Sequence, residues 1–182
     1  MTFAAVLLPA LLFQSGDSLE SLLERLRTED AAARREALGL LRGAMDAGQA
    51  EEGANRVLEV LERVPGPLEK GALIRTLGAL GAAGAVRPLS ALLADRSEKN
   101  VHLKRSCAAA LAAIGRPRGI RALVDALAAE DVYVRQGATS ALEGTGADLS
   151  GYDPRAGEEE NRAALARVRA WGATKFGAAW DE

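Results

Sequence analysis

Apolar residues recur along this chain at helical spacing, and one such pattern occurs four times. Each copy starts with a cationic residue and continues with three mostly apolar residues at short intervals. The four copies are Arg34 with Ala37, Leu40 and Leu41; Lys70 with Leu73, Leu77 and Leu80; Lys104 with Cys107, Leu111 and Ile114; and Arg135 with Ala138, Leu142 and Thr145. The cationic residues are 36, 34 and 31 positions apart. A period of this length with helical spacing predicts a stack of repeated helices, an α-solenoid.

A helix start precedes each copy of the pattern. The residues four positions before the cations are Asp30, Gly66, Asn100 and Asp131. These residue types favour the first, non-helical position of a helix, and Pro67 follows Gly66 where its missing N–H costs nothing. We expect the side chains of Asp30, Asn100 and Asp131 to accept hydrogen bonds from backbone N–H groups two or three residues later.

A second apolar stripe lies before each copy and predicts another helix in every repeat. Its members are spaced i, i+3, i+7, which places them on one helix face. The stripes are Leu19, Leu22 and Leu26; Val57, Val60 and Val64; Val86, Leu89 and Leu93; and Ile120, Leu123 and Leu127. Each repeat is therefore a first helix, a turn and a second helix. Gly81, Gly115 and Gly146 are expected to end second helices as left-handed caps.

The pattern predicts an all-α fold with about four helical hairpins over residues 17–146. The predicted helices are 18–28, 31–45, 51–64, 67–81, 84–95, 101–115, 117–129, 132–145 and 157–178.

The second-helix strings 104–115 and 132–138 resemble HEAT-like repeats of the short, Ala-rich bacterial kind related to those of phycobilisome lyases. Pro88 stands at a first-helix position where that family often has proline, and Asp131 and Arg135 match its recurrent Asp and Arg. The second repeat departs from this pattern, with Gly66 and Lys70. The resemblance covers roughly residues 18–146 and implies the solenoid fold, whereas a fold by itself does not define a function.

The two ends of the chain differ from the repeats. Residues 3–13 form an unbroken apolar run, too short to span a bilayer as a helix but of the length of a signal-peptide core. No Lys or Arg occurs in residues 1–16, and the alternative is an apolar segment folded over the first repeat. We predict that residues 1–16 are a signal peptide and that the protein is exported to the periplasm or outside the cell; a cytoplasmic location is the alternative.

Residues 147–182 are predicted to be a loop and a C-terminal helix that caps the last repeat. Terminal repeats of a solenoid need an atypical unit over their open face. We expect Trp171 to be buried there, against the fourth-repeat residues Ile120, Leu123 and Leu142. Trp180 lies beyond the predicted helix end and is expected to be exposed.

Composition and charge limit the functional classes. The formal net charge is −2, from 23 basic and 25 acidic residues, which argues against a nucleic-acid-binding protein. No integral membrane span is expected. The single cysteine, Cys107, falls on a buried stripe and is interpreted as a small core residue.

We find no catalytic, cofactor or metal motif in the sequence. The single histidine, His102, lies at a predicted helix start without a second metal-binding residue beside it. Gly78, Gly81 and Gly84 fit neither nucleotide-binding fingerprint. The sequence therefore predicts a chain that is not an enzyme and has neither a cofactor nor a metal ion.

The candidate site is a row of arginines on the second helices. Arg35, Arg42, Arg75 and Arg105 occupy positions that point away from the predicted core, and the row ends in neutral and acidic residues at the fourth repeat. In the resembling family these helices line the concave surface. We predict a non-catalytic scaffold that binds an acidic protein partner there. The alternatives are a lyase-like or accessory enzyme that holds a small ligand in the groove, and a stabilising subunit of an envelope complex.

Overall fold

A computed structural model describes residues 66–180 continuously, together with residues 21, 24, 25, 32, 33, 36, 54, 55, 57–59, 61 and 62. The earlier described positions are all helical and fall within the predicted helices 18–28, 31–45 and 51–64. The bounds of those three helices, the predicted cap at Asp30 and the predicted signal peptide of residues 1–16 lie outside the described residues.

Every regular element within residues 66–180 is a helix, as predicted. The α-helices are α5 (Pro67–Leu80), α6 (Val86–Ala94), α7 (Val101–Ile114), α8 (Pro117–Ala126), α9 (Val132–Glu143) and α10 (Glu158–Phe176). Two short 3₁₀ helices, η2 (Ala83–Ala85) and η3 (Gly177–Trp180), precede α6 and follow α10. The α-helices begin and end within three residues of their predicted bounds.

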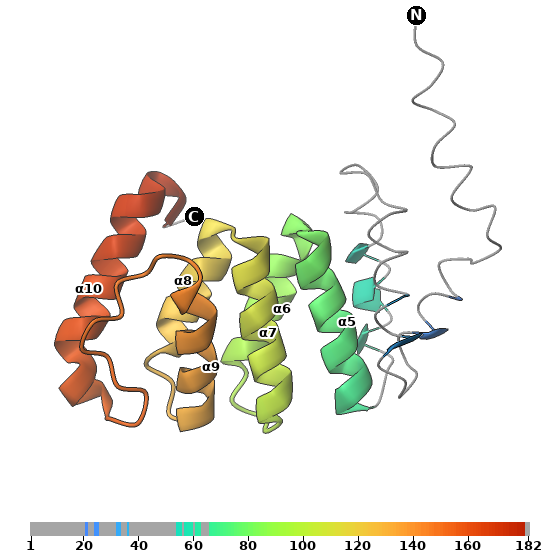
Figure 1. The fold of residues 1–182 in the computed structure, drawn as a ribbon, viewed down its shortest axis with the longest axis horizontal. Helices are drawn as coiled ribbons and strands as arrows, with labels where there is room; N and C mark the ends of the chain where they lie inside the picture. The colour runs from blue at the N-terminus through green and yellow to red at the C-terminus, as the bar shows by residue number, and fades with distance from the viewer. Residues whose placement is uncertain are drawn as a thin grey trace, which may run out of the picture.

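These helices form two layers (Figure 1). The second helices α5, α7 and α9 lie in sequence, with α5 packed on α7 and α7 on α9. The first helices α6 and α8 pack against each other in the other layer, and each also contacts the second helix of its own hairpin. This arrangement is the α-solenoid that the repeat pattern predicts.

The predicted start signals explain where the second helices begin. Asn100 Oδ1 accepts a 3.0 Å hydrogen bond from the backbone N–H of Leu103, and Asp131 Oδ1 accepts one of 2.7 Å from that of Tyr133. Gly66 has no side chain to cap α5, but its extended backbone leads directly into Pro67. Each side-chain cap satisfies one of the backbone donors left free at a helix start.

The predicted glycine stops are confirmed in two of three cases. Gly81 and Gly115 take left-handed conformations, with φ of 66° and 68°, directly after α5 and α7. The prediction for Gly146 is wrong in detail, because α9 ends at Glu143 with Gly144 as a right-handed cap. Gly146 has a φ of 81°, but it lies in the turn that follows the helix.

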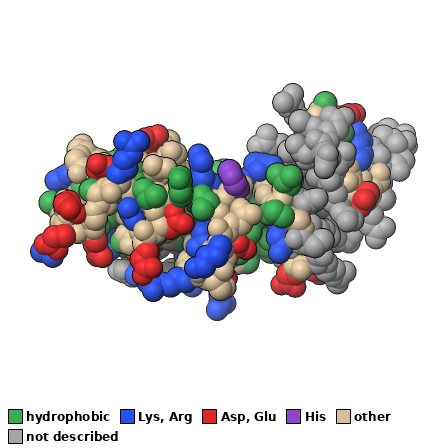
Figure 2. All heavy atoms as spheres, turned by 90° about the horizontal axis from the view of Figure 1, so that it is seen from below, with side chains coloured by type: hydrophobic (Ala, Val, Ile, Leu, Met, Phe, Trp, Pro, Cys, Tyr) green, Lys and Arg blue, Asp and Glu red, His purple; other side chains and the backbone are tan. Residues whose placement is uncertain are grey.

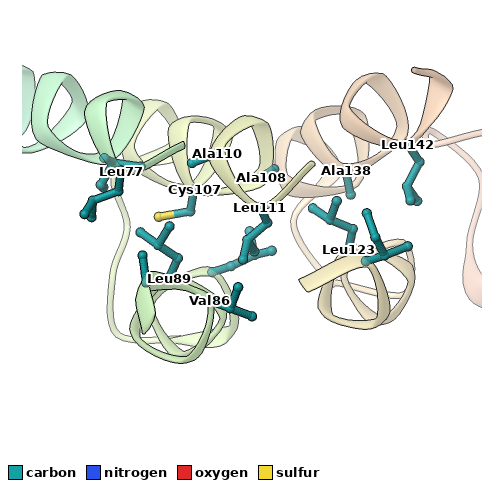
Figure 3. Packing of buried hydrophobic residues seen from close by; sticks show 14 of the residues in the cluster. Leu77, Val86, Leu89, Cys107, Ala108, Ala110, Leu111, Leu123, Ala138 and Leu142 are labelled. Atoms are coloured by element: carbon teal, nitrogen blue, oxygen red, sulfur yellow. The ribbon is translucent and has the colours of Figure 1, made fainter. Parts of the chain in front are cut away.

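The core is built from two or three buried Val, Leu or Ile side chains on each α-helix between α5 and α10. Leu77, Leu89, Leu111, Leu123 and Leu142 are fully buried and point between the two layers (Figure 3). Small residues allow the helices to approach: a Cβ added to Gly78 on α5 would lie 2.7 Å from the Cα of Ala110 on α7. The Ala-rich second helices therefore stack closely, as small residues at a helix contact permit.

The last helix caps the stack as predicted, but the tryptophan buried beneath it is Trp180 and not Trp171. Helix α10 packs on α8 and buries Leu165 and Val168 in the core cluster. Trp180 is buried, with 7% of its surface exposed, whereas Trp171 is only partly buried. The prediction that Trp171 is buried and Trp180 exposed is wrong, because η3 also packs on α8 and places the Trp180 ring over Gly172.

The segment between α9 and α10 is held to the fourth repeat and to α10 by polar side chains that are partly or fully buried. Arg135 Nε donates a 2.7 Å hydrogen bond to the carbonyl of Pro154, and the Tyr152 hydroxyl donates to the carbonyl of Leu127. Asn161, buried in the first turn of α10, accepts from the N–H of Asp153 at 2.8 Å and donates to its carbonyl at 2.7 Å. These contacts orient α10 for its place on α8.

Candidate functional site

Arg75 and Arg105 are exposed on adjacent second helices. Arg75 lies on α5 and Arg105 on α7, and these helices pack directly against each other. The structure therefore places two of the four predicted arginines on successive repeats of one layer. Arg35 and Arg42, the other two, lie outside the described residues.

Each of these arginines is positioned by the next helix in the layer. Arg75 Nη1 lies 3.5 Å from the Ser106 hydroxyl on α7, to which it donates a hydrogen bond. The stem of Arg105 lies against Gly137 on α9, where an added Cβ would come within 2.9 Å of Arg105 Cγ. A long side chain that rests on a neighbouring helix keeps its charged end outward and loses less conformational freedom on binding.

The cationic row ends at the fourth repeat. On α9 the positions that follow Arg135 at the corresponding spacing are Gln136, which is partly buried, and the exposed Ser140 and Glu143. Near the start of the chain, Glu36 forms a 2.7 Å ion pair with Arg25. One of the acidic residues that could have neutralised the row is therefore already paired with a different arginine.

The described surface carries both signs of charge. Figure 2 shows Lys and Arg side chains interspersed with Asp and Glu over the described helices, and the histidine at the surface. The two arginines thus stand out because they are exposed on adjacent second helices, and not through a continuous basic surface.

The histidine and the cysteine, which were considered for metal binding or catalysis, both lie on α7. His102 is exposed in the first turn of α7. Cys107 is fully buried, as predicted, and burial raises the pKa of its thiol to about 12. Among the residues that the structure describes, no group of three or more His, Cys, Asp or Glu side chains could hold a metal ion.

No helix within the described part of the chain combines the length and apolar character needed to cross a bilayer.

A cavity on the first-helix side was missed by the sequence reasoning. It lies between α6 and α8, has a volume of about 650 Å³, and includes Ser90 and Lys104 among its lining residues. The repeat pattern identified Lys104 as an anchor of the helix but gave no sign that its side chain meets a cavity. The position of Ser90 in the sequence of α6 also gives no sign that its side chain lines a cavity.

Comparison with known proteins supports the repeat assignment. The model of the HEAT repeat family matches residues 54–143. A solved structure of human deoxyhypusine hydroxylase in complex with glycerol is similar, with a TM-score of 0.53 and 31% sequence identity. The similarity covers 69% of this chain but 42% of the hydroxylase chain, so this chain corresponds to less than half of that protein. No curated protein sequence matches the chain.

The prediction that the chain is not an enzyme is contradicted by this comparison. The hydroxylase has HEAT-like helices over the matched region and is itself an enzyme. A similar fold therefore occurs in an enzyme, and the fold alone does not decide between catalysis and binding, because one fold can host several functions.

The family match covers the helix pairs described above. The match of the family model begins before α5 and ends at Glu143, the last residue of α9. Residues 54–143 of this chain are therefore HEAT-like repeats.

Proposed function

We propose that this protein binds an acidic segment of a partner protein along the outer face of its second helices. The observation that carries the proposal is the pair Arg75 and Arg105, exposed on the adjacent helices α5 and α7, about one helical turn apart in the repeat, and each resting on the next helix. Stacked repeats commonly bind partners along an extended face of one helix layer.

The regular stacking favours an extended partner segment. Because α5 and α7 lie side by side, a chain that crosses both helices can place one acidic side chain near each guanidinium. Each guanidinium offers several N–H donors in a plane, which suits a carboxylate. The exposed position of both arginines means that they contribute mainly to encounter rate and orientation.

The test is a titration with a fluorescein-labelled glutamate-rich peptide, followed by fluorescence anisotropy. We expect the Arg75→Ala/Arg105→Ala double variant to bind roughly three- to tenfold more weakly, in line with two exposed charge pairs. Binding by the unaltered protein should weaken as salt is raised, because exposed charges are screened. The matched control is Arg169→Ala, which removes an exposed arginine from α10 at the far end of the stack.

Equal peptide binding by the double variant and the unaltered protein would reject the proposal. So would tighter binding of a single-stranded oligonucleotide than of the peptide, since that result would assign the arginines to phosphate recognition. In the source cells, the partner should be a protein that co-purifies with the unaltered protein. The amount that co-purifies should fall with the double variant and stay the same with Arg169→Ala.

A further inference from the structure

The cavity between α6 and α8 has the size and walls of a small-molecule site. Its volume of about 650 Å³ lies within the range that binds small organic ligands. Its walls are largely the methyl groups of alanines on the two helices and the turn after α8: Ala91, Ala94, Ala122, Ala126, Ala128 and Ala129. Val134 of α9 and Lys104 of α7 also line it. Such walls suit an apolar body of modest size.

Lys104 brings a positive charge into this apolar surrounding. Only 9% of its surface is exposed, which makes it one of the few buried polar side chains in the described part of the chain. Among the described residues, none forms a hydrogen bond or an ion pair with its ammonium group. A buried charge without a partner is costly, and an anion in the cavity would lower that cost.

The equivalent residue of the next repeat shows how such a cation is normally satisfied. Arg135 occupies the same repeat position on α9, and its Nη1 donates to the carbonyls of Ala129 and Glu130 at 2.6 and 2.8 Å. Its Nε donates to the carbonyl of Pro154. No carbonyl of the turn before α7 accepts a hydrogen bond from the Lys104 ammonium, so one repeat has its cation bound to the backbone and the other has it lining a cavity.

Most acidic groups around the cavity already accept other bonds. Glu98 accepts from the N–H of Asn100 at 2.7 Å, and Asp131 accepts from that of Tyr133. Glu130 is 3.3 Å from Arg96 in an ion pair. The fourth acid, Asp125, lines the cavity from α8 and is exposed. Among the described residues, none of these acids forms an ion pair with Lys104, and the exposed Arg87 and Arg118 add positive charge to the lining.

Ser90 provides a second unsatisfied group. Its hydroxyl oxygen is buried, and within the described residues it has no hydrogen-bond partner. Ser90 lines the same cavity from α6, across from α8. A hydroxyl can turn about its side-chain bond to donate to an oxygen placed in the cavity.

We propose that the cavity between α6 and α8 binds a small organic anion, with its carboxylate or phosphate bound by Lys104 and Ser90 and its apolar body against the alanine walls. This site is separate from the arginine row, which lies on the opposite layer. It adds a small-molecule ligand to the protein partner proposed above and does not depend on that partner.

The experiment is a nuclear magnetic resonance titration of the full chain with benzoate and with phenyl phosphate. We expect either or both anions to shift the backbone amide signals of residues that line the cavity, such as Ser90, Ala94 and Ala126. Benzyl alcohol and benzylamine, of similar shape but without negative charge, should cause no such shifts. Inorganic phosphate alone should bind more weakly than phenyl phosphate, because it lacks the apolar body. The comparison of benzoate with phenyl phosphate decides between a carboxylate and a phosphate ligand.

Two variants locate the site. Lys104→Met keeps the length of the side chain and removes the charge, and it should weaken anion binding at least tenfold. Ala122→Leu fills part of the cavity while Lys104 remains, and it should weaken phenyl phosphate binding more than phosphate binding. The matched control Lys175→Met removes a lysine from α10, outside the cavity, and should leave binding unchanged. Amide shifts confined to other surfaces, or equal affinity in the Lys104→Met protein, would overturn the proposal.

Discussion

The Arg121 side chain on α8 donates a 3.0 Å hydrogen bond to the backbone carbonyl of Trp180. This bond joins the last helical turn of the described chain to the first helix of the fourth repeat. The Trp180 ring covers Gly172 on α10 and stacks on Phe176, with ring centres 5.8 Å apart. The cap is thus held by two sets of contacts. Helix α10 packs on α8, and η3 packs on both α8 and α10.

Trp180→Ala should destabilise the protein by about 3–5 kcal/mol, the range for removal of a large buried aromatic side chain. The variant loses the ring that fills the space between Gly172 and α8, although the backbone bond to Arg121 can persist. Chemical unfolding followed by circular dichroism measures the change without relying on tryptophan fluorescence.

Trp171→Ala is the comparison, since both variants lose one tryptophan. Trp171 is only partly buried and contacts Phe176 edge-on, with 6.0 Å between ring centres. Its removal should cost clearly less than that of Trp180. A larger loss from Trp171→Ala would show that the ring of Trp171, as the sequence suggested, closes the stack.

Gly78→Ala should destabilise the stack by about 1–3 kcal/mol, because the added methyl group has no room. Its Cβ would lie 2.7 Å from the backbone Cα of Ala110, an atom that cannot move away without shifting α7. The measurement is again the free energy of unfolding from denaturant titration.

Gly144→Ala provides the matched control. Gly144 has a right-handed conformation, with φ of −74°, and a Cβ there would meet nothing within 4 Å. The same chemical change should stabilise the protein there by about 0.4–1 kcal/mol, through the smaller entropy of the unfolded chain. Similar effects at both glycines would mean that helix propensity, and not the close contact with Ala110, controls position 78.

The sequence was sufficient to predict the helices and their order, because the signals involved are local. Caps such as Asn100, the proline after Gly66 and the stripe of Leu73 and Leu77 act within one or two turns. Their fourfold recurrence then implies stacking, since a helix pair with one apolar face must cover it with a neighbour.

The sequence could not locate the cavity or rank the tryptophans, because both depend on how distant segments meet. Lys104 and Arg135 look equivalent along the chain, yet carbonyls of the turn before α9 and of Pro154 reach Arg135 alone. The burial of Trp180 follows from a reversal at Gly177, whose φ of 58° no helical periodicity encodes. Of the candidate site, the exposure of Arg75 and Arg105 was predictable, but their supports on Ser106 and Gly137 were not.

Asp131→Ala should lower stability by about 0.5–2 kcal/mol, because the N–H of Tyr133 loses the acceptor that caps α9. Asn100→Ala should have a similar effect at α7, where Leu103 N–H loses its partner. Thermal unfolding of each variant measures the loss. Replacement of Asp131 by Asn or Ser should retain most of the stability, since these side chains can also accept the bond. If Asp131→Asn is as damaging as Asp131→Ala, the negative charge matters more than the cap.

The buried thiol of Cys107 should make stability fall in alkaline solution. Burial is the main cause that raises its pKa from the ordinary 9.0 to about 12, and the nearby charge of Glu98 acts in the same direction. Above pH 9 the unfolded chain releases this proton, whereas the folded chain keeps it until about pH 12. The unfolded state is therefore favoured increasingly as pH rises between these values, and the contribution of the neutral thiol to stability is fully present only below pH 9.

Cys107→Ala should remove this part of the pH dependence. We expect the free energy of unfolding of the unaltered protein to decline more steeply between pH 8.5 and about 11 than that of the variant, while other titrating groups affect both equally. The variant will be less stable at neutral pH, because it leaves a small space between the layers, so the slopes and not the absolute values are compared.

A thiol reagent such as dithionitrobenzoate should also react slowly with the folded protein and rapidly after unfolding, since the reactive thiolate forms only when the side chain reaches water. Parallel pH slopes for the two proteins, together with rapid modification of the folded chain, would mean that Cys107 reaches solvent and that the contact between the layers around it opens readily.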